Sequence, residues 1–234
     1  MKIQVPQIRT VVGISCVILA IFLIVLMILT PWLERKPDDQ KIHNMMGISM
    51  ILDVSTDGKH VHQVGNSWLR QMLPLFWAES RLCTTSCVQI RDTSNTLRSP
   101  CVYGVGYKSY HWLTDSATQG IVVGSGSTAV TFSDYKLETI IGSGSGSGQL
   151  TYNASVWQAM TTPTDSSSWQ VTRTFTNNSG STITVREVGI YMESGLQAGG
   201  SINFCGARDV LAEAVEVEAL HVLTVTYTIQ MTLE

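Results

Sequence analysis

The chain has 234 residues, with 15 basic and 18 acidic side chains and a formal net charge of −3. Charged residues make up 14% of it, against about 25% in a typical soluble domain. A near-neutral, charge-poor chain lacks the basic surface that sequence-independent nucleic-acid binding requires, so we expect no nucleic-acid partner. The length suits one ordinary domain with a small extension.

Residues 11–32 form an uncharged apolar run, VVGISCVILAIFLIVLMILTPW. The hydrocarbon core of a bilayer takes about 20 apolar residues as a helix, so this run predicts a membrane-spanning helix. Pro31 and Trp32 suit the end of such a helix, because a helix stops readily at proline and an indole ring prefers the headgroup level. Two other interpretations stay open: a hydrophobic stem buried in an assembly, and a cleaved signal peptide, although no A-x-A-like site follows.

Composition divides the chain into three parts. We expect an N-terminal hydrophobic, transmembrane-like helix in residues 1–36, a polar linker with a small mixed segment in residues 37–91, and a β domain in residues 92–234. The last part is rich in Ser, Thr and Gly, as extended and solvated strands often are.

A short helix is predicted within the mixed segment. An aromatic and aliphatic stripe recurs there at helical spacing, formed by Trp68, Leu69, Met72 and Leu73. Asn66 and Ser67 suit an N-cap, and Pro74 suits the end of the helix. We expect the stripe to pack in the core rather than bind a ligand.

From residue 88 onward the pattern changes to strands separated by turns. Strand-like runs stand at residues 88–91, 120–123, 150–157, 169–176, 182–192 and 223–233. The last run alternates strictly, which predicts Tyr227 and Ile229 in the core and Thr226 and Thr228 facing outward. Many short strands of this kind predict a mainly β fold, a β-sandwich or jelly-roll-like domain preceded by the N-terminal hydrophobic helix.

Two local features stand between residues 175 and 192. The turn-rich sequence TNNSGST predicts a hairpin that joins its flanking strands. In the following strand the apolar positions change phase between Val185 and Val188, which predicts a β-bulge near Arg186 and Glu187.

No pattern in the chain specifies a reaction. The glycine-rich Gly142–Gly148 lacks the Lys-Ser/Thr pair and the following helix of a phosphate loop, so it predicts a flexible turn. No nucleophile stands in a recognisable context with a histidine and an acid. We therefore expect no enzyme, no catalytic residue and no cofactor. Asn153-Ala-Ser and Asn177-Asn-Ser match the N-glycosylation pattern, which matters only in a glycosylating pathway.

The chain has five cysteines. Cys16 lies in the apolar run, where it serves as a small apolar residue. The other four are candidates for one or two disulfides, with free thiols as an equal alternative: Cys83, Cys87, Cys101 and Cys205. A zinc site at the first three is disfavoured because no histidine stands at a finger-like spacing, and we expect no metal.

Six segments from residue 92 onward are distinctive as a series. They are DTSN at Asp92–Asn95, GIVVGSGSTAVTFSDYKLETIIGSG at Gly120–Gly144, GQLTY at Gly148–Tyr152, RTFTNNSGSTITVREVGIYM at Arg173–Met192, ARDVL at Ala207–Leu211 and LTVTYTIQ at Leu223–Gln230. The series resembles a family of uncharacterised virion-associated structural proteins from tailed-phage and prophage genomes. The resemblance implies a β-rich particle component with no activity to transfer. The N-terminal hydrophobic helix is unusual for that family.

These observations predict a non-enzymatic structural protein of a virion or particle. Its expected partners are copies of itself or other virion proteins, and a membrane through residues 11–32. The alternative is a membrane-anchored surface module that recognises a glycan or a host receptor. Both predictions place the β domain outside the cytoplasm, on a virion or on a membrane.

Overall fold

The structure is a computed structural model that describes residues 47–65, 68–72, 74, 89–99, 118–164, 166–195 and 201–232. The helix predicted in residues 11–32 lies outside this part. Among the described residues, no helix has the length and apolar character needed to cross a bilayer. The chain divides into two compact units, Met1–Gly47 with Leu233–Glu234, and Ile48–Thr232. The following description concerns the second unit.

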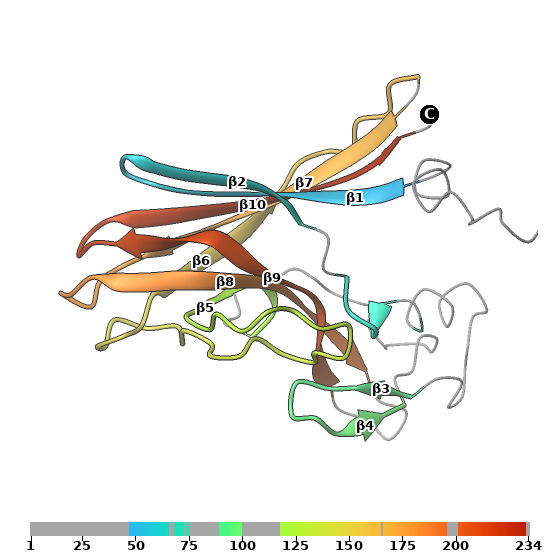
Figure 1. The fold of residues 1–234 in the computed structure, drawn as a ribbon, viewed down its shortest axis with the longest axis horizontal. Helices are drawn as coiled ribbons and strands as arrows, with labels where there is room; N and C mark the ends of the chain where they lie inside the picture. Colours follow the sequence, from blue (N-terminus) through green and yellow to red (C-terminus); the bar gives the residue numbers. More distant parts are fainter. Residues whose placement is uncertain are drawn as a thin grey trace, which may run out of the picture. The chain divides into compact units, whose positions relative to one another are not determined.

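The described part is mainly β and is built from antiparallel strand pairs, which confirms the fold class at that level (Figure 1). Its strands are β1 (Gly47–Thr56), β2 (Lys59–Gly65), β3 (Ile90–Arg91), β4 (Leu97–Arg98), β5 (Gly120–Gly124), β6 (Thr151–Trp157), β7 (Ser166–Thr176), β8 (Ile183–Gly195), β9 (Ser201–Val217) and β10 (Val222–Thr232). They form a five-stranded sheet in the order β2-β1-β10-β7-β6, a three-stranded sheet in the order β5-β8-β9, and the small β3-β4 pair.

The β domain begins earlier than the predicted boundary at residue 92. β1 lies between β2 and β10 in the five-stranded sheet, so residues of the mixed segment complete the same sheet as the last strand. Met50, Leu52 and Val54 alternate along β1 and are fully buried. This period of two is the signal that assigns the segment to a sheet with one covered face.

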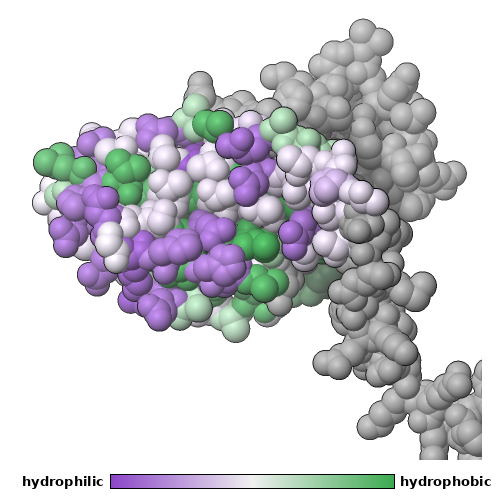
Figure 2. Space-filling model, turned by 90° about the horizontal axis from the view of Figure 1, so that it is seen from above, coloured by the Kyte–Doolittle hydropathy of each residue, from purple (hydrophilic) through white to green (hydrophobic). Residues whose placement is uncertain are grey.

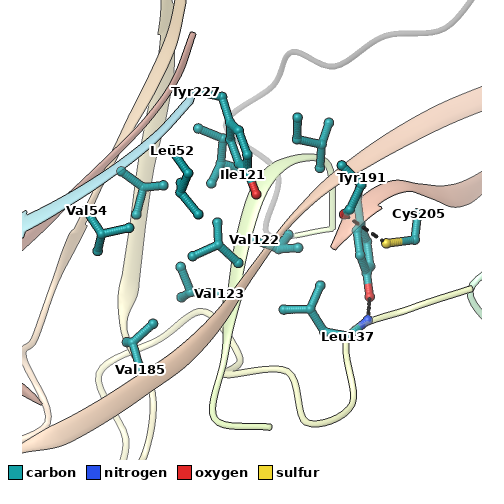
Figure 3. Packing of buried hydrophobic residues seen from close by; sticks show 14 of the residues in the cluster. Leu52, Val54, Ile121, Val122, Val123, Leu137, Val185, Tyr191, Cys205 and Tyr227 are labelled. Atoms are coloured by element: carbon teal, nitrogen blue, oxygen red, sulfur yellow. Dashed lines mark hydrogen bonds between the residues drawn. The ribbon is translucent and has the colours of Figure 1, made fainter. Parts of the chain in front are cut away.

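One hydrophobic core joins the inward faces of the two larger sheets (Figure 3). Leu52 comes from β1, Val123 from β5 and Val185 from β8, and all three are fully buried. In β10, Tyr227 and Ile229 are buried and the intervening threonines are half-buried, as the alternation predicted. The outward Thr226 hydroxyl pairs across strands with the Thr172 hydroxyl at 2.9 Å.

The hairpin predicted at TNNSGST is wrong, because this segment crosses from β7 in the larger sheet to β8 in the smaller one. Asn177 anchors the crossing and is fully buried. Its side-chain amide donates to the carbonyls of Ser181 and Val217, both at 2.7 Å, and its backbone N–H donates to the carbonyl of His221 at 3.0 Å. Turn-forming residues specify a change of direction, but here tertiary hydrogen bonds decide which sheet the next strand joins.

The predicted β-bulge is confirmed. The register of β8 against β9 shifts between Val185 and Glu187. Arg186 is exposed, whereas Glu187 and Val188 on its C-terminal side are both buried. The bulge therefore places a carboxylate inside the protein, where it must find partners.

The short helix predicted from Trp68 does not begin there. Trp68 forms an isolated bridge with Ala207, and the backbone N–H of Leu69 donates to the carbonyl of Gly206 at 2.9 Å. These residues cover part of the β9 edge. Leu69 and Met72 are buried, which confirms the predicted core packing for these two residues of the stripe; Trp68 is half-buried, and Leu73 lies outside the described residues.

Side chains of β2 cover another part of that edge. Gln63 donates through Nε2 to the carbonyl of Val210 at 3.0 Å and accepts through Oε1 from the N–H of Ala212 at 2.8 Å. Lys59 Nζ donates to the carbonyl of Ala214 at 2.6 Å. One amide side chain thus occupies a backbone donor and a backbone acceptor, as a neighbouring strand would.

Arg173 of β7 connects β6, in the five-stranded sheet, with β5, in the three-stranded sheet. The side chain is fully buried. Its Nε donates to the carbonyl of Asn153 at 2.7 Å, and its Nη1 donates to the carbonyls of Gln119 and Ile121 at 2.6 and 3.0 Å. Its guanidinium carbon lies 4.9 Å from the centre of the Tyr152 ring. Arg173 therefore links the two sheets at their edge strands β5 and β6.

Candidate interaction surface

The histidines of the described residues lie at the surface, each with a ring nitrogen close to a carboxylate oxygen. His60 and His62 both contact the same oxygen of Asp53, at 3.0 and 2.7 Å, and His221 contacts Asp57 at 2.8 Å. In the part of the chain that the structure describes, no group of three or more His, Cys, Asp or Glu side chains could hold a metal ion. The contacts of Asp53 join β1 to β2, and the contact of Asp57 joins the turn between these strands to His221.

Of the four cysteines predicted as disulfide candidates, only Cys205 lies among the described residues. Cys205 of β9 is a free, fully buried thiol whose Sγ donates to the carbonyl of Ala207 at 3.3 Å. It lies beside Tyr191 in the core (Figure 3). Burial raises the pKa of the Cys205 thiol well above its ordinary value. Cys83, Cys87 and Cys101 lie outside the described residues, and a disulfide among them stays a prediction.

We expect Cys205 to resist alkylation in the folded chain. The thiolate is the reactive form, and burial both disfavours it and excludes the reagent. Iodoacetamide labelling at mildly alkaline pH, followed by peptide mass spectrometry, checks this, with a urea-unfolded sample as the control. Native labelling of Cys205 as fast as in urea would contradict the buried placement.

The two sequence matches for N-glycosylation have different environments. Asn177 is fully buried with its amide hydrogen-bonded, so the folded chain does not present it for modification. Asn153 lies on β6 and is exposed, but its amide nitrogen donates to the hydroxyls of Thr174 and Thr176 at 3.0 and 3.3 Å.

A buried ionic network surrounds the carboxylate that the bulge turns inward. Glu187 is fully buried and pairs with Arg208 of β9, whose Nε donates to it at 2.8 Å. Glu187 also accepts from three backbone N–H groups, those of Gly126, Glu138 and Thr139. Burial alone would lower the pKa of Arg208, but its hydrogen bonds to Glu187 and Asp134 raise it. The network fixes the loop between β5 and β6 to the sheet.

The same network holds a turn at the surface. Arg208 Nη1 donates to Asp134 at 2.6 Å, and Asp134 accepts from the hydroxyl and the N–H of Thr131 at 2.5 and 3.1 Å. Burial alone would raise the pKa of Asp134, but these hydrogen bonds hold it below its usual value. Phe132 stands in this turn, where its carbonyl accepts from the N–H of Arg70 at 3.1 Å. Its side chain is 68% exposed, so a fixed turn presents an aromatic ring to solvent.

An apolar groove of about 560 Å³ lies against this turn. We call it the apolar groove, and its lining is Ile48, Trp68, Leu69, Met72, Phe132, Met160, Ser167, Trp169, Ile229, Gln230 and Met231. None of these lining residues is charged, and Ser167 and Gln230 are the polar ones. Ile48, Met160 and Met231 are exposed, with Met160 at 62%. These large apolar side chains, left in water at one place, make the groove the candidate interaction surface of the described residues.

The groove contrasts with the face seen in Figure 2, which is mostly hydrophilic or intermediate, with hydrophobic residues in small separate patches. The predictions from sequence missed the groove because Ile48, Phe132 and Met160 come from distant segments. The available signal was weak: Phe132 and Met160 each stand as a single large apolar residue within a polar, turn-rich stretch.

Comparison of the chain with protein-family models, curated proteins and solved structures gave no match.

Proposed function

We propose that the chain is a non-enzymatic structural protein of a virion or similar particle, which assembles with copies of itself or with other particle proteins. We further propose that the body is a β-sandwich of the jelly-roll type, preceded by a hydrophobic helix in residues 11–32. Two antiparallel sheets that share one core support the fold assignment. The series of segments from residue 92 that resembles virion-associated proteins supports the particle assignment.

The apolar groove is the observation that carries the proposal. Within the described residues, Arg208 pairs with both Glu187 and Asp134, and Gln63 covers part of the β9 edge. The groove instead leaves large apolar side chains in water. Association removes such surface from water, which is favourable in proportion to the apolar area covered. A rigid domain that carries an apolar contact surface is what a structural component of an assembly needs.

The membrane-anchored binding module is the second candidate. Trp169 lies in the lining of the groove, and an aromatic face can stack on the apolar face of a sugar ring. A sugar also presents many hydroxyl groups that need partners when water is removed. Among the described lining residues, Ser167 and Gln230 are the polar ones, so this part of the groove favours an apolar occupant over a glycan.

Assembly of the full-length chain tests the proposal. Purified in a mild detergent, the chain should sediment as a defined oligomer and show rings or filaments in negative stain. In isolated particles it should be present in many equal copies. A chain that is monomeric at every protein concentration and absent from isolated particles would overturn the proposal. A single copy per particle would favour the surface module.

A further inference from the structure

We propose that the apolar groove is a two-fold interface, in which Phe132 of each copy inserts into the groove of the other. This inference rests on the proposed self-assembly and adds the surface and the symmetry. The occupant of the groove is then a second copy of this chain.

Shape is the first argument for a second copy. A two-fold interface uses the same patch on both partners, so that patch must carry both a protrusion and a hollow. Phe132 is 68% exposed on the turn at the side of the groove, which makes its ring the candidate for the protrusion. Buried Leu69 and Met72, with half-buried Trp68 and Trp169, line the hollow. An aromatic side chain seated in an apolar pocket is the usual energetic centre of an interface.

Charge is the second argument. Near a two-fold axis a residue lies close to the same residue of the other copy, so a charged lining would place like charges together. Every lining residue of the groove that the structure describes is uncharged. The two polar members, Ser167 and Gln230, carry hydrogen-bonding groups that tolerate a copy of themselves. A strongly acidic or basic partner would find no complementary charge in this lining.

Rigidity is the third argument. Asp134 accepts hydrogen bonds from Thr131 and Arg208, and the carbonyl of Phe132 accepts from Arg70. The turn is therefore fixed before association. A contact residue that is already ordered loses less conformational freedom on binding, which favours affinity. The buried ionic network thus has a second role, as the support of an exposed contact residue.

Substitution of the protrusion provides the test. In the full-length chain, Phe132→Asp should raise the dissociation constant of the contact by at least about 30-fold, the effect of losing an interface anchor. Phe132→Trp should keep assembly, because it keeps an aromatic ring. The matched control is Leu220→Asp: Leu220 is 81% exposed outside the groove, and its φ of 68° suits Asp. Sedimentation equilibrium gives the constants, and circular dichroism verifies the fold of each variant.

A photocrosslink locates the contact independently. With p-benzoylphenylalanine at position 132, crosslinks should join two chains and map to groove residues such as Met160 or Met231. The same amino acid at position 220 should give no such products. Assembly that Phe132→Asp leaves intact, or crosslinks confined to one chain or to a bound lipid, would overturn the two-fold interface while leaving the proposed function standing. A wild-type chain that is monomeric but present in particles would overturn the interface alone, and one that is monomeric and absent from particles would overturn both.

Discussion

Glu187→Ala should lower the free energy of unfolding by about 3–5 kcal/mol, the cost of leaving a buried ion-pair partner uncompensated. Glu187 is fully buried, and Arg208, its partner, is almost as deeply buried. The substitution also removes the acceptor for three backbone N–H groups in the loop between β5 and β6. Urea unfolding followed by circular dichroism measures the loss.

Glu216→Ala is the matched control for this loss. Glu216 lies on β9 and is exposed, so its removal should change stability by no more than about 0.5 kcal/mol. Glu187→Gln should fall between the two variants, because an amide oxygen keeps an acceptor while the charge facing Arg208 is lost. A Glu187→Ala variant as stable as Glu216→Ala would show that the network contributes little to folding.

Arg173→Met should cost about 3 kcal/mol or more, because buried acceptors left without a donor each cost about 1–3 kcal/mol. Methionine fills much of the arginine volume but donates no hydrogen bond. The carbonyls of Asn153, Gln119 and Ile121 would all lose this donor. We expect the loosening to appear first where β5 and β6 end the two sheets, and hydrogen exchange at Ile121 can detect it.

Arg186→Met separates this effect from the loss of any positive charge. Arg186 is exposed on β8, so the same change there should be nearly neutral. Equal destabilisation by the two substitutions would be incompatible with a specific role of Arg173 between the sheets.

Regular alternation made part of this fold predictable from sequence. The buried face of β10 follows from its alternation, because successive side chains point to opposite faces. Tyr227 and Ile229 lie on the buried face, and Thr226 and Thr228 on the other. The phase change around Arg186 likewise located the bulge. Both signals are local, since they depend only on neighbours along the chain.

Pairings between distant residues could not be predicted in the same way. Most of β9 was missed because Arg208 and Asp209 resemble loop residues, yet both are buried. Arg208 is stabilised there by Glu187, and Asp209 accepts from the Tyr227 hydroxyl at 2.9 Å. No local sequence pattern predicts these hydrogen-bond partners, because they lie far apart along the chain. The crossing at Asn177 and the apolar groove were missed for the same reason, since both depend on tertiary contacts.

The hydrogen bonds of Gln63 to the β9 edge affect how the chain associates at high concentration. If the chain is a particle component, as proposed above, it accumulates at high local concentration, where an uncovered sheet edge acts as a template for uncontrolled cross-β growth. By occupying the N–H of Ala212 and the carbonyl of Val210, the Gln63 amide removes part of that template without adding a strand. Order in such an assembly would then come from side-chain surfaces, whose contacts can form, dissociate and be corrected during construction.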